Sequence, residues 1–132
     1  EYPKTYEECC DVLSIQSYYK LRYYTYEHGY TEYATTNKLC SLQDKLNILG
    51  KLIICRDAYW KIAGEEMGLD KPWEPDWLND KQDKYVLFTH NNAICSNRYV
   101  FGHNSLAFPT EEMRDAFYEN FRDLIEQCKE LL

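Results

Sequence analysis

A chain of 132 residues that is 45% hydrophobic is long enough to bury one core, and its four prolines and five glycines do not suggest a disordered linker. The formal net charge is −7 and the basic residues are not clustered, which disfavours a protein that binds the phosphates of duplex nucleic acid. No apolar run approaches the roughly 20 residues that span a bilayer, so we expect one domain, residues 1–132, without a membrane-spanning segment.

The first predicted element is a short helix over residues 5–14, because Thr5 and Glu8 have the spacing of a capping box. A Tyr-rich segment, residues 16–40, follows it. Its tyrosines at spacings i, i+4, i+7 and i+11 favour a helix, while the alternation over residues 19–23 fits a strand equally. These four tyrosines are Tyr19, Tyr23, Tyr26 and Tyr30.

A long helix is predicted over residues 41–67, with Ser41 as its N-cap and Gly68 just beyond its C-terminal end. Two adjacent apolar stripes run along it, so we expect it to be largely buried. The stripes are Leu42, Leu46, Leu49, Ile53 and Trp60, and Ile48, Leu52, Cys55, Tyr59 and Ile62.

The second half of the chain changes to a strand-like period. A W-E-P-D-W connection, residues 72–84, leads to three predicted strands over residues 85–108, with a tight turn at Asn91 and Asn92. A helix over residues 110–131 closes the chain, and residues 110–132 carry seven acidic against three basic side chains. The prediction is an α+β fold in which helices pack on one face of a small three-stranded antiparallel meander and an amphipathic C-terminal helix closes it.

This order of elements resembles a group of small uncharacterised proteins encoded by gut bacteria of the Bacteroides group and by their phages or prophages. The residues that carry the resemblance are the W-E-P-D-W segment (73–77), Leu106-Ala107-Phe108 and the helix that begins at Thr110. It covers residues 42–132, with the helix at Thr5 as a weaker match, and the Tyr-rich segment departs from it. The resemblance implies a fold and a phage-related context, and it brings no activity or catalytic residues.

The six cysteines show neither a C-x-x-C motif nor zinc-finger spacing, and Cys9 and Cys10 are adjacent. Cys55 and Cys128 fall on apolar helix faces, where free thiols behave as small hydrophobic side chains. We therefore expect reduced thiols, a cytoplasmic location, no metal and no cofactor.

Two candidate binding sites stand out. In the W-E-P-D-W segment, the rings of Trp73 and Trp77 with Asp76 between them can form either a shallow pocket or a lid over the core. The tyrosines of the Tyr-rich segment, Tyr19, Tyr23, Tyr26 and Tyr30, can form a surface for a protein partner, because tyrosine is favoured at interfaces.

Two other functions are weighed against these. Residues 80–109 are the only net-positive stretch, and their aromatic residues could stack a single-stranded nucleic acid or a glycan. The residues in question are Lys84, Tyr85, Phe88, Arg98, Tyr99 and Phe101. Catalysis could involve His28, His90 or His103 with Glu74 or Asp76, but no G-x-S-x-G, P-loop, G-x-G-x-x-G or H-E-x-x-H motif occurs. We therefore expect a non-enzymatic accessory protein that binds a protein partner or itself.

Overall fold

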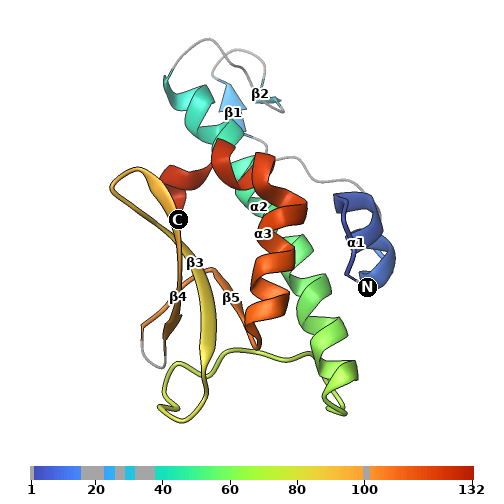
Figure 1. Cartoon of the computed structure of the whole chain (residues 1–132). Coiled ribbons are helices and arrows are strands. Elements are labelled where there is room, and N and C mark those ends of the chain that lie inside the picture. Colours follow the sequence, from blue (N-terminus) through green and yellow to red (C-terminus); the bar gives the residue numbers. More distant parts are fainter. Residues whose placement is uncertain (1, 16–22, 26–28, 32–37, 100–101) are drawn as a thin grey trace.

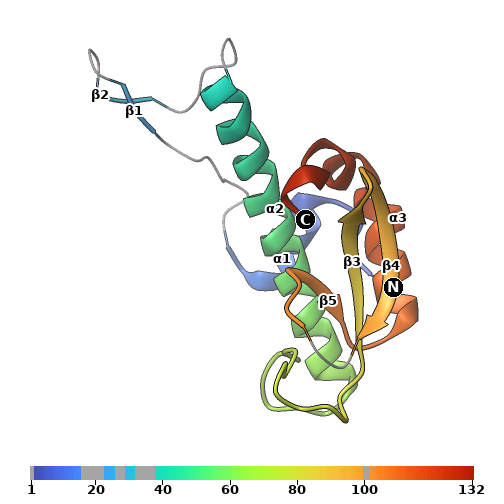
Figure 2. The same cartoon turned by 90° about the vertical axis from the view of Figure 1, so that its left-hand side faces the viewer.

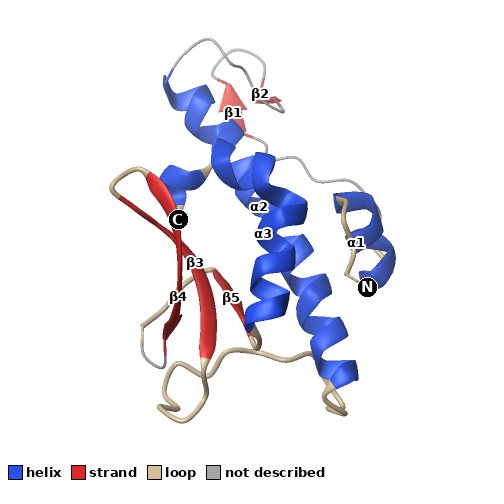
Figure 3. Cartoon of the chain, in the orientation of Figure 1, coloured by secondary structure: helices blue, strands red, loops and turns tan. Residues whose placement is uncertain are grey.

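The computed structural model describes residues 2–15, 23–25, 29–31, 38–99 and 102–132 (Figures 1 and 2). The elements in chain order are α1 (Tyr6–Leu13), β1 (Tyr23–Thr25), β2 (Gly29–Thr31), α2 (Lys38–Glu66), β3 (Lys84–His90), β4 (Ala93–Tyr99), β5 (Leu106–Phe108), α3 (Glu111–Gln127) and the 3-10 turn η1 (Lys129–Leu131). The predicted α+β class, with helices on one face of an antiparallel three-stranded sheet and a closing C-terminal helix, is confirmed (Figure 3). Among the described residues, no helix is both long and apolar enough to cross a membrane.

Side-chain caps begin the first and last helices. The backbone N–H of Glu8 donates to Oγ1 of Thr5 at 3.1 Å, and the N–H of Met113 donates to Oγ1 of Thr110 at 3.1 Å. The long helix differs from its prediction, because α2 begins at Lys38 and the expected N-cap Ser41 lies inside it. At its other end Gly68 has φ +72°, as a residue that terminates a helix requires.

The described part of the Tyr-rich segment is not helical. Strands β1 and β2 pair antiparallel, with Tyr24 opposite Tyr30, so the favoured helix is wrong for residues 23–25 and 29–31. The strand alternative concerns residues 19–23, of which residues 19–22 lie outside the described residues. Tyr19 and Tyr26 lie outside the described residues, and Tyr23 and Tyr30 are placed as positions of β1 and β2.

The strand order of the larger sheet is β4-β3-β5, which corrects the predicted meander order. Residues Asn91 and Asn92, with φ 52° and 62°, form the expected two-residue turn between β3 and β4. The next strand, β5, then pairs with the free side of β3, with Val86 opposite Ala107. Strand β3 is central, with β4 and β5 on its two sides, and it is more buried than β4.

The core lies between the sheet and the helices. Helix α1 packs on α2, α2 packs on α3, and α3 covers β3 and β5 (Figure 1). Aromatic rings dominate this core, with Phe117 at 4.8 Å from Phe108 and 4.9 Å from Phe121 between ring centroids. At Phe121 the backbone of α3 leaves helical values (φ −122°, ψ 22°), so the helix is kinked there.

Candidate functional site

Trp73 of the W-E-P-D-W connection belongs to the core. Only 4% of its surface is exposed, and its ring meets that of Trp60 edge-on with centroids 5.8 Å apart. Its backbone N–H also donates to the carbonyl of Trp60 at 3.0 Å. Trp73 therefore fixes the connection to α2 and offers almost no surface to a ligand.

Trp77 and Asp76 lie closer to the surface. The half-buried Trp77 ring contacts the His103 ring at 5.8 Å, and the buried Lys84 ammonium lies 5.5 Å from the Trp77 centroid, within cation–π range. Asp76 accepts the backbone N–H of Leu78 at 3.1 Å, as a turn-forming aspartate does. The structure thus separates the three predicted residues of this loop, with Trp73 inside and Asp76 and Trp77 at the rim.

A cavity of about 440 Å³ lies beside this loop, between Trp73, Pro75 and the amide side chain of Gln82. That amide is already engaged, because its oxygen accepts the N–H of Asp76 and its nitrogen donates to the Glu74 carbonyl at 3.3 Å. The Gln82 amide therefore closes the loop on itself across this cavity and is not free to bind a ligand.

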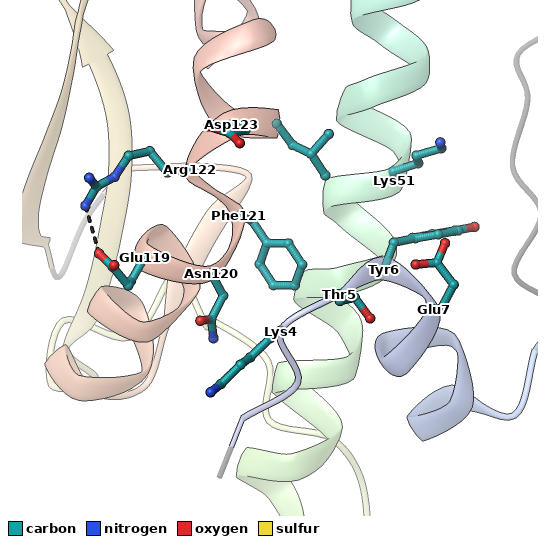
Figure 4. A pocket seen from close by; sticks show the side chains of 11 residues that line it. Lys4, Thr5, Tyr6, Glu7, Lys51, Glu119, Asn120, Phe121, Arg122 and Asp123 are labelled. Atoms are coloured by element: carbon teal, nitrogen blue, oxygen red, sulfur yellow. Dashed lines mark hydrogen bonds and ion pairs between the residues drawn. The ribbon is translucent and has the colours of Figure 1, made fainter.

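The largest of the described cavities, about 500 Å³, lies where the start of α1 meets α2 and the kink of α3 (Figure 4). Its charged side chains are balanced in number, three basic and three acidic. They are Lys4, Lys51 and Arg122, and Glu7, Glu119 and Asp123. Arg122 already pairs with Glu119 at 2.8 Å, as the dashed line in Figure 4 marks. This balance does not select a ligand of either charge.

A buried hydrogen-bond network adjoins that cavity. The Tyr59 hydroxyl donates to the Pro3 carbonyl at 2.7 Å and accepts from Nδ2 of Asn120 at 2.9 Å. Burial raises the pKa of Tyr59 above its usual value, while the Asn120 amide acts in the opposite direction. The network holds the N-terminal segment between α2 and α3, which is a structural role.

Five cysteines are free thiols in the structure, and all but Cys95 are buried. They are Cys9, Cys10, Cys55, Cys95 and Cys128. Contact with the Cys9 thiol and burial raise the pKa of Cys55, and burial raises the pKa of Cys128 to about 11. Thiols held protonated in this way are poor nucleophiles. Among the described residues, no group of His, Cys, Asp and Glu is arranged to hold a metal ion.

Two of the candidate catalytic histidines lie at opposite ends of one strand. His90 is at the end of β3 that leads into the turn, whereas His103 contacts Trp77 near Lys84, at the other end of the same strand. Seven residues of strand span about 20 Å. His28 lies outside the described residues.

The N-terminal part of α2 forms a projection that we call the helical arm, residues 38–46. Helix α2 has 29 residues and α3 has 17, so at 1.5 Å per residue α2 is longer by about 18 Å. Figure 2 shows the arm extending past α3 and the larger sheet towards β1 and β2, which lie away from the larger sheet. Among the described residues, α3 does not cover this end of α2, although Lys45 of the arm forms an ion pair with Glu130 of η1.

Leu42 and Leu46 of the arm are exposed, with 42% and 37% of their surface accessible. The sequence assigned both to a buried stripe, so this expectation is wrong at the arm. They lie one turn apart on the same face of the helix. The signal that could have located them is the unequal length of the two helices, because a helix of 17 residues cannot cover one of 29.

Comparison of the chain with models of known protein families, with curated proteins and with solved structures finds no match.

Proposed function

We propose that this chain is a non-enzymatic protein-interaction protein that binds a partner protein through the helical arm and the adjoining β1–β2 hairpin. The observation that carries the proposal is the exposure of Leu42 and Leu46, one turn apart, on the end of α2 that extends past α3. Paired apolar side chains at this spacing are the anchors by which a helix docks into a groove of another protein.

The hairpin adds a second contact region of suitable chemistry. Strands β1 and β2 contain Tyr23, Tyr24 and Tyr30, and tyrosine supplies a large contact area at low entropic cost. Each leucine that passes from water into a groove contributes roughly 1 to 2 kcal/mol, since each is already partly covered. A partner that contacts both the arm and the hairpin would gain enough area for specific binding.

The arm is tested by a double substitution, Leu42→Glu with Leu46→Glu, in affinity capture from the native host cell followed by quantitative mass spectrometry. We expect the captured partner to fall at least tenfold, because two charges would enter an apolar groove. The matched control is Met67→Glu with Leu69→Glu, at the opposite end of α2, where the side chains are 54% and 41% exposed. A partner that binds both double variants equally would contradict the proposal.

A second candidate is a module that stacks a single-stranded nucleic acid or a glycan. Phe88 and Tyr99 lie on the sheet face away from the core residue Leu87, with ring centroids 5.8 Å apart. Trp77 and Lys84 lie on the same side, at the end of β3. Titration with oligonucleotides and glycans would quench Trp77 fluorescence if a ligand stacks there, and no quenching would leave the arm as the sole candidate.

A further inference from the structure

The two edges of the larger sheet differ in whether other parts of the chain bind their outward backbone groups. At β5 the outward carbonyl of Ala107 accepts Nε1 of Trp60 at 2.8 Å, and the neighbouring carbonyl of Ser105 accepts Nη1 of Arg56 at 2.9 Å. Both donors come from α2, which therefore closes this edge. No further strand can pair there without breaking these bonds.

The other edge, β4, is open. The residues on either side of the two-residue turn between β3 and β4 form a hydrogen-bonded pair. Along an antiparallel ladder, hydrogen-bonded pairs alternate with pairs that are not hydrogen-bonded to each other. Every second residue of β4 therefore directs its N–H and C=O away from β3. These residues are Ile94, Ser96 and Arg98. Within the described chain, the N–H of Arg98 is taken by Oδ1 of Asn97 at 2.7 Å, and the outward groups of Ile94 and Ser96 have no partner.

The β4 edge also lacks the features by which proteins prevent strand pairing. It has seven consecutive residues in regular register, with no proline and no bulge, and its only charged side chain is that of Arg98. Ser96, at its centre, is exposed, and so are Asn97 and Arg98 beside it.

We propose that β4 pairs antiparallel with β4 of a second copy of this chain, about a two-fold axis at Ser96. The pairing places Ser96 opposite Ser96 and Ile94 opposite Arg98 of the second copy, and the Arg98 N–H exchanges its bond to Oδ1 of Asn97 for one to the facing strand. The result is a continuous six-stranded sheet, in the order β5-β3-β4-β4-β3-β5, whose two outer edges are those that Trp60 and Arg56 already close. Within the described chain the larger sheet of each copy has one open edge, so pairing through this sheet stops at two.

The helices leave room for this arrangement. Helix α3 packs mainly on β3 and β5, and it reaches β4 through Arg114, whose Nη1 donates to the Asn97 carbonyl at 3.2 Å. With α3 over β3, the α3 helices of the two copies would be three strand spacings apart, about 14 Å. Packed helices need only 8–10 Å between their axes. The acidic faces of the two α3 helices therefore do not have to meet.

The side chains of β4 are compatible with a copy of themselves, which favours a second copy over a different partner. The residue at the axis is small and uncharged, and the single charge, on Arg98, faces the aliphatic Ile94. On the other sheet face the half-buried Tyr99 would cover the exposed Ala93. A seven-residue edge buries much less than the ~800 Å² per partner of a standard interface, so we expect a dissociation constant of roughly 10 to 100 µM.

The test is sedimentation equilibrium of the full chain from about 5 µM to 1 mM, a range set by that expected constant. Two variants, Ser96→Lys and Ser96→Glu, each place like charges opposite one another only if the axis is at this residue. We expect each variant alone to be monomeric and an equimolar mixture of the two to form the dimer again. Ser96→Thr, which keeps the N–H and adds a strand-favouring side chain, is expected to dimerise like the wild-type chain.

Circular dichroism shows whether each variant is folded, and Ser96 is exposed in the monomer, so neither charge disturbs the core. A wild-type chain that remains monomeric at 1 mM would overturn the proposal. An extended segment of another protein would then be the candidate partner of the β4 edge. The proposal would also be overturned if each charged variant, on its own, dimerised as strongly as the wild-type chain. The inference does not depend on the helical arm, because the Leu42 and Leu46 substitutions lie outside β4.

Discussion

The Tyr59 hydroxyl joins three segments that are far apart in the sequence, because Pro3, Tyr59 and Asn120 meet at one oxygen. We expect Tyr59→Phe to lower the free energy of unfolding by about 1 to 2 kcal/mol, since it removes a buried donor and leaves the Pro3 carbonyl only the Asn120 amide at 3.4 Å. Urea denaturation measures this change. Tyr118→Phe is the control, and a loss of equal size there would show that the network has no special role.

At this scale the sequence predicts burial better than it predicts contacts. The periodicity of α2 correctly puts Tyr59 and Leu52 inside, because each repeats on one helix face with apolar neighbours. The sequence does not distinguish Trp73 from Trp77. Trp73 is buried because it packs on Trp60, thirteen residues earlier, whereas Trp77 packs on His103 nearer the surface. The same limit hides the exposure of Leu42, because the apolar stripe continues past the point where α3 ends.

At the level of elements, Gly64 shows how closely the chain returns to α2 after that helix ends. A Cβ at Gly64 would lie 2.2 Å from the Lys71 carbonyl oxygen and 2.9 Å from Cα of Pro72. Gly64→Ala should therefore destabilise the fold by roughly 1 to 3 kcal/mol, although alanine favours helix by about 1 kcal/mol. Thermal unfolding gives the stability, and near-UV circular dichroism reports whether Trp73 moves.

Gly68→Ala is the contrasting variant. Nothing lies within 4 Å of a Cβ there, but φ is +72°, so its cost comes from the backbone alone, about 1 kcal/mol. We expect it to leave the near-UV spectrum unchanged. A Gly64→Ala variant more stable than the wild-type chain would mean that residues 70–73 do not pack as described.

Element types follow from the sequence more securely than element partners. The two caps, Thr5 and Thr110, are local signals and hold in the structure. Ser41 satisfies the same local rule, yet α2 continues upstream of it to Lys38. The position of β5 is a non-local choice, because two α2 side chains bind its outward carbonyls and thereby fix it beside β3.

For the whole molecule, buried thiol and phenol groups predict a loss of stability in alkali. The pKa of Cys128 is about 11 in the folded chain against 9.0 for an ordinary thiol. The stabilising effect is complete below pH 9 and is lost as the pH rises towards 11, because the unfolded chain releases its proton first. Urea denaturation at a series of pH values should show this decline. Cys128→Ala should be less stable at pH 7 but less sensitive to pH, and an identical pH profile would refute the assignment.

The strand order also bears on how the chain is synthesised. Strand β3 receives both of its neighbours from later sequence, and α3, which covers the sheet, is made after all of them. On the ribosome, α1 can already pack on α2, but the side of α2 that faces α3 remains uncovered until Glu111–Gln127 has emerged. A nascent chain of this protein exposes that side of α2 to the cell until α3 is made, and general chaperones that bind exposed apolar helices would meet it during that interval.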